Sequence, residues 1–190
     1  MRIKYSIEFH TDWHCGSGLA AGADVDALVV KDKNKMPFIP GKTLKGLIRE
    51  AVLETRHLRG KDIDNDFEKA FGYFDEETDK DDMKRGNMFF ANATLEENEY
   101  KTIISNDTAR FMYRDIASTA INDNGIAKDH SLRKMEVVVP CILHGEIMNV
   151  PEKMADEIVL SFGFIKRLGQ NRNRGLGRCT IRKEGDNENA

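Results

Sequence analysis

The sequence predicts an α+β domain of the ferredoxin-like (RRM-like) type, with the element order strand, helix, strand, strand, helix, strand. Three observations predict it. Apolar and polar residues alternate at the N-terminus, as they do in a half-buried strand. Two stretches carry apolar residues at helical spacing. Strand-like segments surround the second helix in the required order, at 87–95, 135–148 and 178–183.

The first strand is formed by Ile3, Tyr5, Ile7 and Phe9, which alternate with polar residues. A glycine-rich loop, HCGSGLAAGAD, follows it. The next residues predict a hairpin with arms at 27–30 and 37–40, joined by a turn at 32–35. Aspartate is common in such turns, so we expect Asp32 to serve this one.

The first helix is predicted by a single apolar stripe at i, i+3, i+4, i+7 and i+8: Leu44, Leu47, Ile48, Ala51 and Val52. Thr43 is its expected N-cap, after the break at Pro40 and Gly41. The second helix is expected to begin near Pro151, with Met154, Ile158, Phe162 and Ile165 facing inward. A break at Pro140 is expected within 135–148.

We interpret residues 1–183 as one domain with two weakly patterned insertions, at about 60–86 and 98–134. One is expected to be helical or irregular, and the other an inserted hairpin or thumb. Residues 184–190 are expected to form a disordered tail.

Composition indicates a protein of the cytoplasm. No apolar run is long enough to span a bilayer, and the N-terminus has no signal-peptide core, so we expect no membrane partner. The three cysteines are scattered and form no CxxC pair, which predicts small core residues rather than disulfides or a zinc ribbon.

Charge is distributed unevenly along the chain. The formal net charge is -3, which by itself argues against a nucleic-acid partner. However, the stretch 62–82 is heavily acidic, whereas 161–182 has no acidic residue and several arginines. Because binding follows local potential, a basic strip can still hold a polyanion.

Two basic motifs are candidate phosphate contacts. IPGKT is not a P-loop, because Met36 stands where a glycine is required and Pro40 lacks an N–H. It still predicts a helix start with Lys42 beside it, where Gly41 permits close approach of an anion. Lys45 and Arg49 follow at i, i+4, with Arg56 further along. A solvent-facing basic surface explains this spacing equally well.

The second motif is LGQNRNRGLGRC, where Arg172 and Arg174 offer forked donors for phosphates. Gly175 and Gly177 permit backbone conformations that a side chain would forbid. A loop that needs only flexibility has no reason to be so rich in arginine, so phosphate contact is favoured over a merely flexible surface loop.

Metal binding is weakly indicated. His10, His14 and Cys15 form an HxxxHC cluster, but no fourth ligand follows at a recognised zinc spacing. Asp24, Asp26 and Asp32 surround the predicted hairpin, where a carboxylate could hold a divalent metal. Ordinary turn chemistry accounts for these aspartates as well, and the residues alone leave both possibilities open.

Four segments, in order, resemble the RAMP superfamily of CRISPR proteins, and in particular the repeated backbone subunit of type III (Csm and Cmr) effector complexes. They are FIPGKTLKGLIREA, FEKAFGYF…RGNMFFANA, ASTAINDNGIAKDHSLRKMEVVVP and RLGQNRNRGLGRC. VDALVVKD is similar to the family's loop that carries an aspartate. Asn92 stands where the family often has aspartate, Ala27-Leu28 replaces its Asn-Pro, and 120–122 lacks its arginine.

The resemblance implies a subunit that binds CRISPR RNA and target RNA, assembles with copies of itself and other RAMP subunits, and acts in antiviral defence. It implies RNA contacts by His14, Gly16 and Arg133 besides the basic motifs. It also places a target-cleaving carboxylate at Asp26, acting with a divalent metal, expected to be Mg²⁺. The alternatives are a non-catalytic RNA-binding scaffold and a metal-independent RAMP endoribonuclease that processes precursor CRISPR RNA, with His10 and His14 as candidates.

Overall fold

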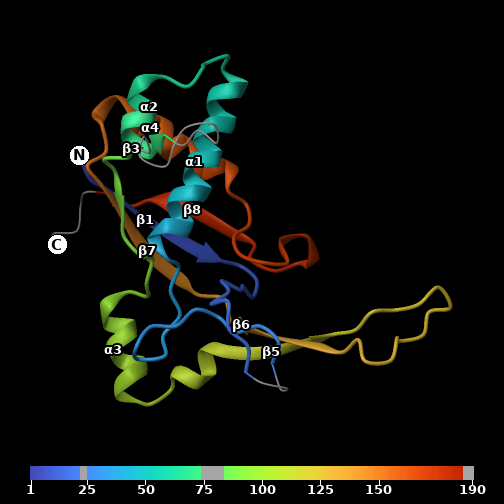
Figure 1. Cartoon of the computed structure of the whole chain (residues 1–190). Coiled ribbons are helices and arrows are strands. Elements are labelled where there is room, and N and C mark those ends of the chain that lie inside the picture. Colours follow the sequence, from blue (N-terminus) through green and yellow to red (C-terminus); the bar gives the residue numbers. More distant parts are fainter. Residues whose placement is uncertain (22–24, 74–83, 186–190) are drawn as a thin grey trace.

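The centre of the fold is a four-stranded antiparallel sheet with the strand order β4-β7-β1-β8 (Figure 1). The computed structural model describes residues 1–21, 25–73 and 84–185. The strands are β1 (Ile3–Phe9), β4 (Phe89–Phe90), β7 (Ile142–Met148) and β8 (Cys179–Lys183). Within β1, Tyr5 lies opposite both Gly145 and Lys183. Counted along the chain this order is 2-3-1-4, so the predicted ferredoxin-like plan is confirmed.

The two long helices, α1 (Gly41–Leu58) and α4 (Glu152–Ser161), pack against each other and cover one face of this sheet. Alternation in β1 directs its apolar residues toward the helices and its polar residues to the other face. The predicted stripes are confirmed, because their main members are buried in the same core: Leu44, Ile48, Val52, Met154, Ile158, Phe162 and Ile165. Burying one such side chain contributes roughly 1.5–3 kcal/mol.

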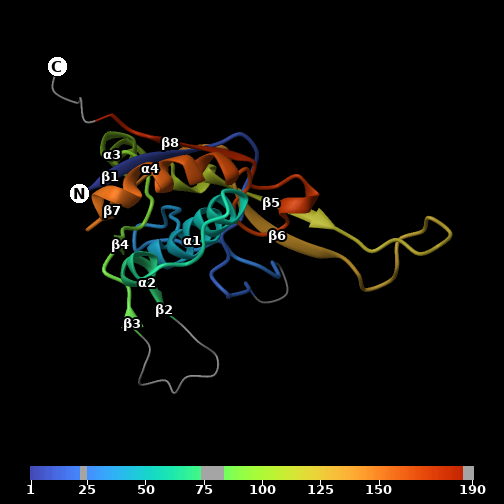
Figure 2. The same ribbon diagram turned by 90° about the horizontal axis from the view of Figure 1, so that it is seen from above.

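A separate hairpin projects from this body. Strands β5 (Tyr113–Ser118) and β6 (Arg133–Val138) pair with each other, and their connection extends well away from the sheet (Figures 1 and 2). We call residues 113–138 the thumb. The inserted hairpin predicted within 98–134 is therefore present, and the break expected at Pro140 separates β6 from β7, which belong to different sheets.

The segment 60–86 differs from its prediction. It contains α2 (Asn65–Phe71) and the short pair β2 (Gly72–Tyr73) and β3 (Lys84–Arg85). Phe67 and Phe71 are buried in the main core, with the ring centre of Phe71 6.0 Å from that of Phe90. The expectation that this segment lies outside the core is thus wrong for α2. Residues 74–83, which include the second part of the acidic stretch, and the end of the predicted tail, at 186–190, lie outside the described residues.

Residues 25–40 form an irregular segment instead of the predicted hairpin. Its arms meet through one bridge, Lys31 with Pro37, while Ala27 pairs with Met135 of the thumb. The predicted turn is confirmed: Asp32 Oδ1 accepts from the N–H groups of Asn34 and Met36. Asp32 Oδ2 accepts from Tyr100 in α3 (Glu97–Ser105), which leads through η2 (Ala109–Met112) into the thumb.

The start of α1 also corrects the prediction. Pro40, not Thr43, is the N-cap residue, and the helix begins at Gly41. The Gly41 N–H donates to the side-chain oxygen of Asn92, 2.9 Å away. A Cβ at Gly41 would lie 1.9 Å from the Phe90 carbonyl oxygen, so this glycine serves contact with β4 rather than with an anion. The strand expected over 87–95 is reduced to two residues, with Asn92 turned toward the helix.

The cysteines behave as predicted. Cys15 and Cys179 are buried and Cys141 is half-buried, and all three are free thiols. Burial raises the pKa of Cys179 to about 11 and that of Cys141 to about 12, which disfavours the reactive thiolate. None of the described helices combines the length and the apolar composition needed to cross a bilayer.

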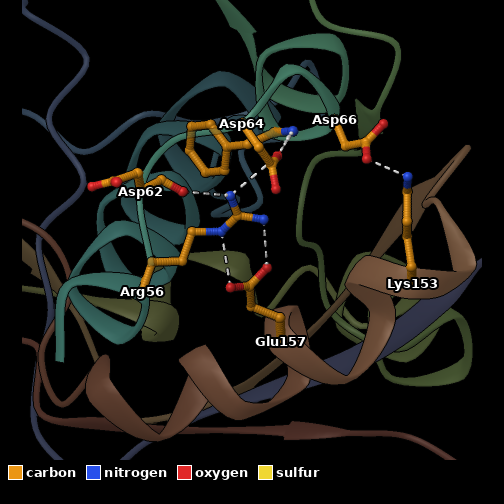
Figure 3. A network of polar contacts seen from close by, with 7 residues as sticks. Arg56, Asp62, Asp64, Asp66, Lys153 and Glu157 are labelled. Carbon is orange, nitrogen blue, oxygen red and sulfur yellow. Dashed lines mark hydrogen bonds and ion pairs between the residues drawn. The ribbon is translucent and has the colours of Figure 1, made fainter. Parts of the chain in front are cut away.

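Arg56 is the centre of a buried polar network that joins α1, α2 and α4 (Figure 3). Its Nε and Nη2 each donate to one carboxylate oxygen of Glu157, both at 2.9 Å. Nη1 donates to the Asp62 carbonyl and lies 3.2 Å from Asp64. Burial alone would lower the pKa of Arg56, but the hydrogen bonds that its guanidinium donates to Glu157 and Asp64 raise it. The expectation that Arg56 extends an exposed basic line is therefore wrong.

Breaking this network should destabilise the fold. Arg56→Met leaves Glu157 as an unpaired carboxylate in a largely buried position, so we expect the free energy of unfolding to fall by about 3 kcal/mol. Adding Glu157→Leu should restore part of this loss, because the lone charge is then removed. Urea unfolding measures both. Lys153→Met is the control: it breaks the exposed pair with Asp66 and should cost under about 1 kcal/mol. Equal losses for Arg56→Met and Lys153→Met would contradict the assignment.

Candidate nucleic-acid interface

The glycine-rich loop, residues 165–178 with the short η4 (Arg172–Arg174), is held against the chain that follows β1. The Gln170 N–H donates to the His14 carbonyl at 2.9 Å, and the Gly177 N–H donates to the Asp12 carbonyl at 2.7 Å. The Leu168 N–H donates to the Gly177 carbonyl, which closes the loop on itself. The loop is thus a fixed part of the fold.

Two glycines make this packing possible. Gly169 and Gly177 have φ values of +97° and +69°, in the left-handed region that favours glycine. A Cβ at Gly169 would lie 2.4 Å from the His14 carbonyl oxygen, and one at Gly177 would lie 1.9 Å from that of Leu168. At Gly175 the φ is +90°, but no described atom lies within 4 Å of a Cβ built there. Glycine is therefore required at position 177 by close packing, whereas at position 175 it is favoured by the backbone conformation alone.

A groove runs between α1 and this loop. Its first part is a hollow of about 450 Å³, and a second of about 380 Å³ adjoins it and shares Leu47, Glu50 and Arg172. We call the whole the α1–loop groove. The polar and glycine residues that line its first part are His14, Gly16, Lys42, Thr43, Gly46, Glu50, Gly169, Gln170 and Arg172.

The groove carries cations from both walls. Lys42 belongs to α1 and Arg172 to the glycine-rich loop, and Lys166 and Arg167 add to the second hollow. Arg167 Nη1 donates to the Arg172 carbonyl at 2.5 Å, which braces η4. Glu50 lies in both hollows, so the potential is mixed. With Glu54 also lining the second hollow, the groove combines cations and carboxylates and is not uniformly basic.

The other predicted basic residues lie elsewhere. Lys45 and Arg49 do not line the groove, and the Arg49 guanidinium lies 5.6 Å from the ring centre of Phe67 in α2. Burial, and then the charge of Arg49, lower the pKa of Lys45. Arg174 is exposed in η4, and Arg133 is exposed on the thumb. RNA contact by these four residues stays a prediction, whereas His14, Gly16, Lys42 and Arg172 are brought together in one groove.

His14 is fully buried beneath the groove. Its Nδ1 lies 2.6 Å from the Glu136 carbonyl oxygen of the thumb base. Its Nε2 is buried and has no hydrogen-bond partner among the described residues. His10 instead contacts Thr180 on β8, so the two histidines serve different elements. Within the described ranges no three His, Cys, Asp or Glu side chains form a group that could hold a metal.

Asp12 and Gln170 are two residues of this region that the sequence did not single out. Asp12 is buried, and its Oδ2 accepts from Arg114 of β5 at 2.7 Å, while its carbonyl accepts from Gly177. One residue therefore fixes both the glycine-rich loop and the thumb. The sequence signal for Asp12 was a lone acid within HTDWHC, and Gln170 was visible within the loop motif.

Asp26 is exposed at the base of the thumb. Its N–H donates to the Lys134 carbonyl at 2.9 Å, and its Oδ2 accepts from the Lys134 N–H at 2.8 Å. The carboxylate is thus fixed on β6, and its second oxygen can accept another ligand. Asp32 is occupied by its turn, and the rival Asp24 lies outside the described residues.

Comparisons with known proteins agree with this architecture. The chain is similar to a chain in the cryo-EM structure of the type III-B Cmr-beta bound to cognate target RNA, with a TM-score of 0.71 and 11% identity, covering 96% of this chain and 97% of that one. It is also similar to a chain of the apo state of Cmr-beta, with a TM-score of 0.68 and 13% identity over 98% of each. At identities this low, the structural similarity shows a shared fold and no more. No curated protein sequence matches. The family model described as the RAMP superfamily matches residues 6–180, from the first strand to the last, and the chain therefore belongs to the RAMP superfamily.

Proposed function

We propose that this chain is an RNA-binding backbone subunit of a type III CRISPR effector complex and holds the CRISPR RNA guide in the α1–loop groove. The observation that carries the proposal is the pair of cations, Lys42 and Arg172, facing one groove from two different elements. The similar solved structures belong to a type III-B complex, one of them bound to target RNA, which supports this context.

The groove suits a single-stranded polyanion. Arg172 can bind a phosphate through two parallel N–H bonds, and Lys42 acts as a point charge on the next one. Gly16, Gly46 and Gly169 have no side chains that project into the groove, so a sugar–phosphate backbone can approach the protein closely. These contacts involve phosphate, so guide binding should be independent of base sequence.

The thumb is the proposed contact with target RNA and with neighbouring subunits, whether copies of this chain or other RAMP proteins. Ile121, Ile126 and Leu132 lie in the connection between β5 and β6 and are strongly exposed. Apolar side chains on a projecting hairpin favour insertion between bases or into another protein. Asp12 links the thumb to the glycine-rich loop. The site that holds the guide and the thumb that contacts the target would therefore keep fixed positions relative to each other.

Removing the two groove cations tests the proposal. Lys42→Ala with Arg172→Ala should weaken binding to single-stranded RNAs of any sequence. The slope of log K against log salt should fall by about 0.7 for each phosphate that the protein no longer neutralises. Fluorescence anisotropy at several salt concentrations measures both the affinity and the slope.

The matched control is Lys101→Ala with Arg182→Ala, which removes two exposed cations of α3 and β8. The control should leave the slope unchanged. Lys45→Ala with Arg49→Ala shows whether the RNA path continues around α1. An unchanged slope in the Lys42 and Arg172 double variant would refute groove binding.

Target cleavage is a second proposed activity, favoured by the fixed carboxylate of Asp26. Mg²⁺ in nucleotide-processing sites commonly takes one or two carboxylates, with phosphate oxygens and waters as its other ligands. A single oriented oxygen of Asp26 fits that donor set. When bound, the ion supplies charge stabilisation at a phosphoryl oxygen. The residue's own part is to hold this oxygen on β6 at the thumb base.

The alternatives differ in what they require. A non-catalytic scaffold needs only the groove and the thumb. A metal-independent nuclease acting on precursor CRISPR RNA needs acid–base groups together, yet His10 contacts Thr180 and His14 contacts Glu136. That separation favours the target-binding subunit over the processing enzyme.

A further inference from the structure

We infer that Nε2 of His14 accepts a hydrogen bond from the 2′-hydroxyl of a guide nucleotide, and that this contact makes the α1–loop groove select RNA over DNA. The inference rests on the proposed function, since it requires a polynucleotide in the groove. It adds a specificity that phosphate contacts cannot supply, because RNA and DNA present the same phosphates.

The tautomer of His14 follows from its partner. A backbone carbonyl can only accept, so the 2.6 Å contact with the Glu136 carbonyl requires a proton on Nδ1. In the neutral ring the other nitrogen, Nε2, then carries a lone pair and no proton. The ring is buried, so this contact also fixes its orientation. His14 thus holds a hydrogen-bond acceptor at a set position.

No described protein group donates a hydrogen bond to this acceptor. Nε2 is buried and unpartnered within the described part of the chain, and an unsatisfied buried polar group costs roughly 1–3 kcal/mol. The imidazole nevertheless lines the groove. A Cβ on Gly16 would lie 3.1 Å from Nε2, so the absence of a side chain there leaves room for a ligand group beside Nε2.

The side chain of Gln170 lies close to the same point. Its side-chain amide nitrogen also lies 3.1 Å from the place where a Gly16 Cβ would stand. Gln170 is exposed, so its side chain can turn aside when a ligand enters, whereas its backbone stays bonded to His14. A ligand group that reaches Nε2 must be small and must donate.

The neighbours of His14 identify that group. Lys42 and Arg172 lie in the same hollow and match phosphates, and on a ribonucleic backbone the hydroxyl nearest to the phosphates is the 2′-OH. It is a donor, it is small, and it occurs on every nucleotide regardless of base. A phosphate oxygen cannot take its place, because a lone pair facing an anion is unfavourable.

The test uses the full chain and one mixed-sequence single-stranded RNA. The probes are this RNA, the same strand with 2′-deoxyribose, and the same strand with 2′-fluororibose. The fluoro sugar keeps the RNA-like pucker but has no donor, so it separates the hydroxyl from backbone shape. We expect both substituted strands to bind about five-fold to ten-fold more weakly than RNA, the effect of removing one hydrogen bond.

The protein variant is His14→Asn, whose amide N–H can still donate to the Glu136 carbonyl but which has no counterpart of Nε2. It should bind the deoxy strand as the native chain does and lose its preference for RNA. Because the fluoro strand tests the native protein, the result does not depend on how well this variant folds.

The possible outcomes separate the two proposals. Fluoro RNA that binds like RNA would assign the preference to sugar shape and overturn the inference. So would a preference unchanged in His14→Asn, or equal affinity for all three strands. If the native chain bound all strands through Lys42 and Arg172 without preference, the proposed function would stand while this inference fails. If it bound no strand, both would fail.

Discussion

Replacing Gly177 by alanine is expected to lower the free energy of unfolding by about 4 kcal/mol. The new Cβ would stand 1.9 Å from the Leu168 carbonyl oxygen, and the residue would keep a φ of +69°. The opposing atom is backbone, so no side-chain rotation can relieve the overlap. The Leu168 carbonyl could retreat only by disturbing the bonds that join the loop to Asp12 and His14. Gly177→Val should cost more still.

Gly175 provides the matched control. It has a φ of +90°, but its Cβ would meet no described atom within 4 Å, so Gly175→Ala should cost about 1 kcal/mol of backbone strain. Asparagine tolerates left-handed backbone, so Gly175→Asn should recover part of this cost, whereas Gly177→Asn should not. Urea unfolding and RNA affinity are to be measured on all five variants. If Gly177→Ala costs no more than Gly175→Ala, the packing argument is wrong.

Periodicity predicted the central fold well, because it reports which face of an element is buried. The alternation of β1 and the stripes of α1 and α4 placed their residues correctly. The same signal missed α2, a single short amphipathic helix within an acidic stretch. It also could not place the cap of α1, because the partner of Gly41 is Asn92, which comes 51 residues later.

The functional residues divide in a similar way. The glycine-rich loop could be identified locally, since positive φ and close backbone contact are properties of glycine itself. Helical spacing put Lys45, Arg49 and Arg56 on related faces, but spacing does not reveal what each face meets. Arg56 meets Glu157 of α4, and Arg49 meets a ring of α2. The roles of Asp12 and His14 depend on contacts with the distant thumb.

Asp26→Asn in an assembled complex is expected to bind target RNA normally and to cleave it at least about 100-fold more slowly. The amide oxygen of asparagine can still accept from the Lys134 N–H, so the anchor on β6 is kept. The substitution removes the negative charge that would hold a divalent cation near the cleaved phosphate. An effect on rate without an effect on binding therefore isolates the charge.

Two further variants make this result specific. Asp26→Ala removes both the charge and the side-chain bond to Lys134, and a thumb that depends on this bond should then also bind target less well. Asp32→Asn changes a carboxylate that serves the turn and Tyr100, so it should leave the cleavage rate intact if the chain still folds. Single-turnover cleavage over a range of Mg²⁺ concentrations, together with target affinity, distinguishes these variants.

Unchanged cleavage in Asp26→Asn would exclude Asp26 and point to Asp24, and a failure to bind target would make Asp26 structural. A variant that binds target but needs far more Mg²⁺ to cut it would identify Asp26 as a ligand of the ion, since the charge is then the only part of the site that has changed.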